Sequence, residues 1–143
     1  MKVAVRYVSR SGNTKKVAEA IAKAIGTEAK DCSFNLEEEV DVLFLGGSVY
    51  WGGIDKKLKK FIQELDVSHI KYAVTFGTSS IKKEADKEAE NLLRSRNITV
   101  ADHIFHCFGS FSALHKDQPN EEDLKKASAF AIKVVEDLEK KRF

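Results

Sequence analysis

Apolar residues along this chain alternate between two arrangements, short continuous runs and longer segments with helical spacing. The segments that we interpret as strands lie at 3–8, 27–33, 40–47, 72–76 and 103–108. A continuous run such as 40–47 is typical of a strand that is buried on both faces. Because helical segments separate the strands, the pattern predicts an α/β fold with a five-stranded parallel sheet and helices on both faces.

Four segments carry apolar residues at helical spacing, and they lie at about 14–25, 55–65, 81–96 and 120–142. We expect the first helix to end at Gly26, because glycine readily adopts the left-handed conformation found after a helix. Asn120 is predicted to cap the last helix, whose acidic first turn and basic last turn both match the helix dipole. The connection at 34–40 has room for at most two helical turns, so the helix expected there is stunted.

With right-handed crossovers, these elements form a doubly wound sheet. Ligands of such sheets lie beyond the carboxyl ends of the strands. The segments that matter are therefore those after the first, third and fourth strands, at 9–14, 46–53 and 77–80. Arg6 falls in a central strand, where a buried guanidinium must be paired. We expect a structural partner for it, which the sequence does not identify.

Composition indicates an ordinary globular chain. It has 143 residues, of which 43% are hydrophobic and 32% charged, with a single proline and no repeat. This length suits one domain, 1–143, and we expect a monomer. No apolar run approaches the roughly 20 residues that span a bilayer, so we expect a cytoplasmic protein with no membrane partner. The two cysteines, Cys32 and Cys107, lie in predicted strands without metal-ligand spacing around them, and we expect both to be reduced core residues.

Net charge is only +2. The lysines stand beside acids on predicted helix faces, which favours solvated faces over a nucleic-acid stripe. The segments around the three predicted loops nevertheless lean positive, because Arg10, Lys15, Lys16, Lys56, Lys57 and Lys116 stand against Asp55 and Asp117. A partner protein therefore need not be basic where it docks.

The turn after the first strand has the chemistry of a phosphate-binding loop. It is formed by Ser9, Arg10, Ser11, Gly12, Asn13 and Thr14. The hydroxyls can donate to an anion, Gly12 lets the backbone approach it, and the N–H groups of the new helix point to the same place. The alternative to a phosphate-binding loop is a turn that only caps the helix. The turn lacks the motifs of ATP and dinucleotide sites, so a mononucleotide phosphate fits better.

This turn resembles the S/T-x-S/T-G-N-T signature with which flavodoxins hold the phosphate of FMN. The resemblance covers essentially the whole chain and implies a flavodoxin-like sheet with strand order 2-1-3-4-5. It also implies FMN as the cofactor. The uninterrupted last strand is similar to that of short-chain flavodoxins. Arg10, at the variable position of the signature, would screen the phosphate or point to water.

The second segment places adjacent aromatic residues between two glycine pairs. Its site candidates are Ser48, Val49, Tyr50, Trp51, Gly52 and Gly53. Exposed aromatic rings between glycines favour stacking on a ligand, the alternative being a lid on the core. The resemblance implies that Trp51 stacks on the isoalloxazine, with Tyr50 as the alternative, and that the Gly52 peptide faces flavin N5. Many reductase relatives have proline where this chain has Ser48.

In the third segment, Gly77, Thr78 and Ser79 are expected to bond the O2 and N3 edge of the flavin. Flavodoxins usually provide a second aromatic ring in this segment, whereas residues 77–80 of this chain include none. Phe108 or Phe111 would cover the second flavin face instead, or both belong to the core.

Three functions are compatible with these features. The first is an FMN-binding electron carrier that exchanges electrons with redox partner proteins, in which the flavin supplies the chemistry and no side chain acts as a catalyst. The second is an NAD(P)H-dependent FMN or quinone reductase, which needs room above the flavin. The third is an interaction module of the same fold that has lost FMN, and the intact phosphate loop argues against it.

Overall fold

The structure, a computed structural model, describes residues 1–50, 53–79, 86–108 and 119–141. Within these residues, parallel strands follow the order β2-β1-β3-β5-β6, and a short β4 pairs antiparallel with β3. The strands are β1 (Val3–Tyr7), β2 (Ala29–Asp31), β3 (Val40–Tyr50), β4 (Gly53–Ile54), β5 (Ile70–Ser79) and β6 (Val100–Phe108). Because β4 lies off this path, the order confirms the predicted 2-1-3-4-5 topology.

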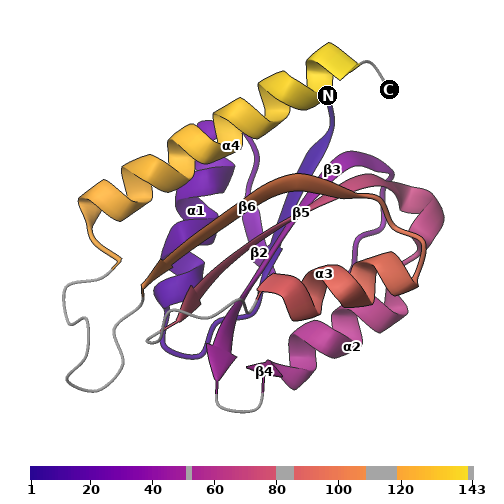
Figure 1. Ribbon diagram of the computed structural model, residues 1–143, viewed down its shortest axis with the longest axis horizontal. Coiled ribbons are helices and arrows are strands. Elements are labelled where there is room, and N and C mark those ends of the chain that lie inside the picture. Colours follow the sequence, from indigo (N-terminus) through magenta and orange to yellow (C-terminus); the bar gives the residue numbers. More distant parts are fainter. Residues whose placement is uncertain (51–52, 80–85, 109–118, 142–143) are drawn as a thin grey trace.

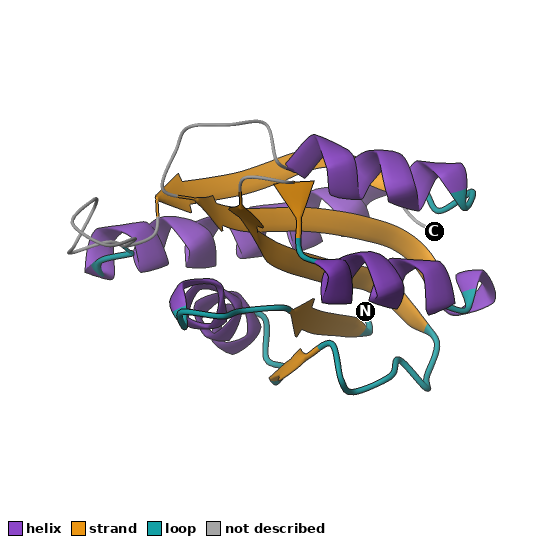
Figure 2. Cartoon of the chain, turned by 90° about the horizontal axis from the view of Figure 1, so that it is seen from below, coloured by secondary structure: helices purple, strands orange, loops and turns teal. Residues whose placement is uncertain are grey.

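Helices cover both faces of the sheet, as predicted (Figures 1 and 2). The helices are α1 (Asn13–Ala24), α2 (Lys56–Glu64), α3 (Asp86–Ser95) and α4 (Glu121–Lys141), and a short 3-10 helix, η1, spans Val67–His69. Figure 1 shows α1 and α4 on one face and α2 and α3 on the other. None of the helices in the described residues is both long and apolar enough to cross a membrane.

Side chains of β3 alternate between two hydrophobic cores. Val42 and Phe44 belong to the core under α1 and α4, whereas Leu43 and Leu45 belong to the core under α2 and α3. All four side chains are buried. A strand with apolar residues on both faces needs cover on both faces, and this explains the continuous run read from the sequence.

The central strands continue three residues beyond the predicted ends at 47 and 76. Ser48 pairs with Thr78 in the parallel ladder, and β3 then folds back through its pairing with β4. Close packing explains the glycines here: a Cβ at Gly46 would overlap the Phe76 ring, and one at Gly47 would lie 2.6 Å from Leu58 Cδ2. The predicted loops 46–53 and 77–80 therefore begin as strand.

Arg6 anchors the connection between β2 and β3, which contains no helix. The residues at 32–39 form turns and irregular structure. The Arg6 guanidinium, 8% exposed, donates to the carbonyl oxygens of Phe34 (3.0 Å), Asn35 (3.3 Å) and Val5 (3.1 Å). Desolvation lowers the pKa of Arg6. The structural partner expected for Arg6 is thus the backbone of this connection.

The predicted helix ends agree with the local geometry. Gly26 has a φ of +74° just after α1. The Asn120 side chain accepts a hydrogen bond from the Asp123 N–H at 2.9 Å, and the Asp123 carboxylate accepts one from the Asn120 N–H at 3.0 Å. This reciprocal pair is a capping box, and it fixes the start of α4.

Candidate functional site

The turn between β1 and α1 is closed by its own side chains. Ser9 Oγ accepts a hydrogen bond from the Gly12 N–H at 3.0 Å. Gly12 has a φ of +91°, a conformation that glycine adopts without the strain of a Cβ. Glycine is therefore required here by the backbone, and the turn brings the start of α1 back over the end of β1.

Helix α1 starts directly after Gly12, its N-cap residue, which has no side chain and therefore forms no side-chain cap. Among the hydroxyls of the turn, Ser9 Oγ accepts from the Gly12 N–H itself. A helix N-terminus after a glycine turn is suited to an anion, because the N–H groups and the helix dipole both favour negative charge there.

A hydrogen bond joins the first predicted segment to the third. Thr14 Oγ1 lies 2.8 Å from Thr78 Oγ1, and both residues are buried, with 0% and 1% of their surface exposed. Thr14 is in the first turn of α1, and Thr78 is near the carboxyl end of β5. The contact brings together residues far apart in sequence at one end of the sheet.

The sheet register brings the second predicted segment to the same end. Ser48 pairs with Thr78, which pairs in turn with Cys107. The backbones of Ser48, Val49 and Tyr50 belong to β3, that of Ser79 belongs to β5, and Gly53 begins β4. The side chains of Ser48, Val49, Tyr50 and Ser79 are not described, and Trp51 and Gly52 lie outside the described residues.

An ion pair between Arg10 and Asp55 connects the phosphate-type turn to the start of α2. Arg10 Nε lies 2.7 Å from Asp55 Oδ2, and the exposed fractions of the two side chains are 66% and 2%. Asp55 also caps α2 by accepting a hydrogen bond from the Lys57 N–H at 2.8 Å. The sequence did not reveal this pairing, because 45 positions separate the residues and only the sheet order brings them together.

The polar groups at this end of the sheet suit a phosphorylated ligand. The first segment contributes the N-terminus of α1 and hydroxyls, and Thr78 adds a hydroxyl from β5. Among the described residues, no group of three or more His, Cys, Asp or Glu side chains could hold a metal ion. The donors that the first and third segments offer are N–H and O–H groups, which bind anions and polar ring edges.

Comparisons with known proteins agree with this geometry. The family model for the flavodoxin domain matches residues 4–117. An uncharacterized protein from Methanocaldococcus jannaschii is 28% identical over 148 residues, which cover 94% of this chain and 99% of that protein. The fold is similar to that of a flavodoxin from the domain Archaea, with a TM-score of 0.79, 24% identity and coverage of 97% of this chain and 99% of that one. It also resembles part of the rubredoxin:oxygen oxidoreductase of Desulfovibrio gigas, with a TM-score of 0.77, 17% identity and coverage of 98% of this chain and 36% of that one.

Proposed function

Because the chain belongs to the flavodoxin family, we propose that it binds one FMN per chain and carries electrons between redox proteins. The family implies a flavin cofactor, and the turn at 9–14 supports FMN in particular, because it offers donors to a phosphate group. The observation that carries the proposal is the hydrogen bond between Thr14 and Thr78, which links this turn to the strand end expected to meet the flavin ring.

Each segment has a separate task in this proposal. The N–H groups at the start of α1 and the hydroxyls of Ser9, Ser11 and Thr14 bind the phosphate. Gly77, Thr78 and Ser79 bond the polar edge of the ring, Trp51 stacks on one of its faces, and Gly52 faces N5. Bound FMN supplies the redox chemistry at its ring system, and the protein sets its orientation and access to water.

Arg10 has an indirect task. Its guanidinium bonds Asp55, so it joins the phosphate segment to the start of α2, directly after the β3–β4 hairpin. In this proposal, Arg10 is a positioning residue that holds the stacking segment over the phosphate segment. Ser48, Val49, Tyr50 and Gly53 provide the backbone of that hairpin.

The flavin content of the purified protein tests the cofactor. Extracted flavin should be FMN, at one per chain, and the fluorescence of Trp51 should rise when FMN is removed, because a stacked flavin quenches it. Trp51 is the only tryptophan, so its signal is unambiguous. Absence of flavin after reconstitution would overturn the proposal.

Reduction by pyridine nucleotides separates the carrier from the reductase. Stopped-flow mixing of the oxidised protein with NADPH or NADH should leave the flavin oxidised, whereas a photochemical reductant should reduce it. Rapid reduction by either nucleotide would favour an NAD(P)H-dependent FMN or quinone reductase.

A further inference from the structure

Positive charge is concentrated in the two segments that border the proposed flavin site. Segments 9–16 and 53–60 hold seven cationic side chains and a single acid, Asp55, in a chain whose net charge is +2. We call the cationic residues the basic rim: Arg10, Lys15, Lys16, Lys56, Lys57, Lys59 and Lys60. The remainder of the chain is therefore net negative, and the rim is a local feature.

The lysines of the rim lie at positions where their positive charge is unfavourable for the helices that carry them. Lys15 and Lys16 are in the first turn of α1, Lys56 and Lys57 are in the first turn of α2, and neither turn contains an acid. Cations at a helix N-terminus are unfavourable because the helix dipole is positive there. Lys56 also stands four residues before Lys60, a spacing at which like charges repel.

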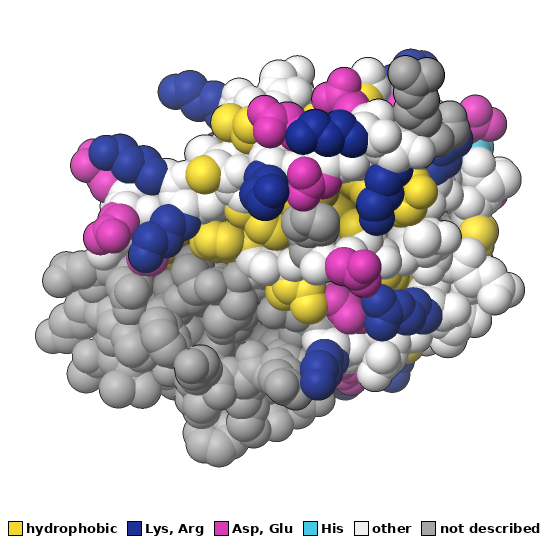
Figure 3. Space-filling view, turned by 45° about the horizontal axis from the view of Figure 1, so that its top comes forward, with side chains coloured by type: hydrophobic (Ala, Val, Ile, Leu, Met, Phe, Trp, Pro, Cys, Tyr) yellow, Lys and Arg dark blue, Asp and Glu magenta, His cyan; other side chains and the backbone are white. Residues whose placement is uncertain are grey.

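The six lysines of the rim lack close acidic partners in the described residues, although Lys57 lies near enough to Asp31 to contribute to the lowering of its pKa. All six are exposed, and within the described part of the chain none forms an ion pair. Helix α4 has the opposite arrangement, with acids in its first turn and the ion pairs Lys126–Glu122 and Lys133–Asp137. Figure 3 shows a face of the molecule on which both signs of charge alternate. The charges in the first turn of α4 thus match the helix dipole, whereas those in the first turns of α1 and α2, beside the site, do not.

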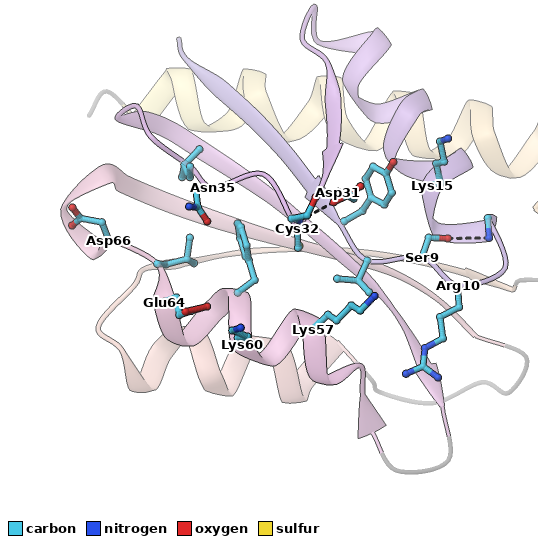
Figure 4. Close-up of a pocket in the computed structure, with 17 residues that line it drawn as sticks. Ser9, Arg10, Lys15, Asp31, Cys32, Asn35, Lys57, Lys60, Glu64 and Asp66 are labelled. Atoms are coloured by element: carbon cyan, nitrogen blue, oxygen red, sulfur yellow. Dashed lines mark hydrogen bonds between the residues drawn. The ribbon is translucent and has the colours of Figure 1, made fainter.

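The two parts of the rim share one surface. The Arg10–Asp55 ion pair joins their segments, and a groove of about 1010 Å³ is lined by Arg10, Lys15, Lys57 and Lys60. The groove lies where the helix between β2 and β3 is missing, beside the 32–36 connection (Figure 4). Its acids are Asp31, Glu64 and Asp66, and Figure 4 shows Glu64 and Asp66 at the end away from Arg10 and Lys15.

We propose that the basic rim is the docking surface for an acidic protein, the redox partner with which the bound flavin exchanges electrons. This inference rests on the proposed function. Lysines that form no ion pair with the described residues and that lie at unfavourable positions of their helices are explained if a partner supplies negative charge, since complementary surfaces steer association and fix its orientation. The rim lies beside the flavin segments, so a partner that it attracts arrives next to the redox centre.

Binding of FMN alone does not account for the rim. A phosphate is one dianion, whereas the rim has six lysines without an ion pair in the described residues, and Lys59 and Lys60 lie beyond the first turn of α2. A surface for nucleic acid is the competing possibility, and it is an outcome of the test below.

Native and succinylated cytochrome c are suitable probes, because they share one haem and one fold and differ in the charge of their lysines. The flavoprotein is first reconstituted with FMN and reduced photochemically. One electron then passes from the reduced flavin to the ferric haem, which becomes ferrous. We expect the acidic, succinylated form to react at least about tenfold faster at low salt, with a rate that falls as salt rises. A faster reaction with the basic, native form would overturn the proposal.

The rim variant Lys56→Glu, Lys57→Glu, Lys60→Glu tests the location of the charge. Its matched control is Lys125→Glu, Lys126→Glu, Lys133→Glu on α4, which makes the same change in net charge on the other face. The rim variant should lose the preference for succinylated cytochrome c, and the α4 variant should keep it. Equal effects of the two variants would assign the preference to net charge and overturn the proposal.

Two further measurements complete the test. Bound FMN is quantified in each variant, and amide shifts are mapped while the succinylated protein is added to the apoprotein, a readout that needs no flavin. Shifts at 15–16 and 56–60 support the docking surface even if FMN binding fails. Shifts elsewhere, or an unchanged preference for succinylated cytochrome c in the FMN-loaded rim variant, contradict it. So does tight binding of a DNA duplex that the rim variant alone loses.

Discussion

Thr14 and Thr78 are 64 positions apart in the chain, and their hydroxyls form a buried 2.8 Å hydrogen bond. This bond ties the first turn of α1 to the carboxyl end of β5. A doubly wound sheet collects its ligand groups at that end, because successive crossovers return there. The contact is therefore the point at which the proposed phosphate and ring subsites meet.

Removal of the Thr14 hydroxyl should weaken FMN. Thr14→Ala loses a donor to a charged group, so we expect a loss of about 1–3 kcal/mol in FMN binding and little change for riboflavin. Flavin-fluorescence titration measures both. The control is Thr27→Ala, whose hydroxyl bonds the Val3 carbonyl at 3.4 Å outside the site. Equal losses for FMN and riboflavin would show that Thr14 does not contact the phosphate.

Loss of the Arg10 guanidinium should destabilise the fold. Arg10→Gln leaves the Asp55 carboxylate, 2% exposed, without its ion-pair partner. Because Arg10 itself is largely exposed, we expect only about 1 kcal/mol of lost stability in urea unfolding. Asp55→Asn keeps an oxygen that can cap α2, and the double variant closes a thermodynamic cycle. Additive losses from the two substitutions would mean that the pair contributes no coupling.

Arg6 should matter more for stability than an exposed arginine does. Arg6→Met removes three hydrogen bonds to backbone carbonyls, so we expect a loss of about 2–4 kcal/mol and faster amide exchange at 32–39. Arg94→Met is the control, since the Arg94 side chain is 51% exposed and its partner at 3.5 Å is a single carboxylate, that of the buried Glu90. If both variants lose the same stability, Arg6 does not anchor this connection.

Cys32 should be a slow nucleophile. Burial raises the pKa of its thiol to about 12, because the thiolate is poorly solvated there. In a Cys107→Ser background, alkylation by iodoacetamide should therefore still accelerate about tenfold per pH unit at pH 10. The unfolded thiol ionises near pH 8.5, so this group also lowers the stability of the fold as pH rises above that value. A plateau in the alkylation rate near pH 9 would contradict the raised pKa.

Local signals in the sequence predicted the strands and most of the helices, whereas the strand order was implied by the resemblance to flavodoxins. The Asn120 cap and the Gly26 stop depend on neighbouring residues, and both were readable for that reason. The extensions of β3 to Tyr50 and of β5 to Ser79 were missed, because glycines at 46, 47 and 77 indicated loops. In the fold, Gly46 and Gly47 instead allow the close approach of Phe76 and Leu58.

Long-range pairings account for what the sequence could not predict in the site. The candidate residues of the first and third segments were named from their chemistry, and the hydrogen bond between Thr14 and Thr78 joins them. The Arg10–Asp55 ion pair and the partners of Arg6 depend on which strands lie side by side, information that no short motif contains. The groove beside α2 lies at the connection between β2 and β3, whose shortness the sequence did indicate, but its lining residues come from segments that only the fold brings together.

The central claim is that residues 9–14 bind the phosphate of FMN. Equilibrium titration of the apoprotein with FMN and with riboflavin, at the same salt concentration, tests it most directly, because the two ligands differ only in that group. Several donors to a charged group contribute roughly 1.5–3 kcal/mol each, so FMN should bind at least about 100-fold more tightly than riboflavin. Equal affinities would contradict the account.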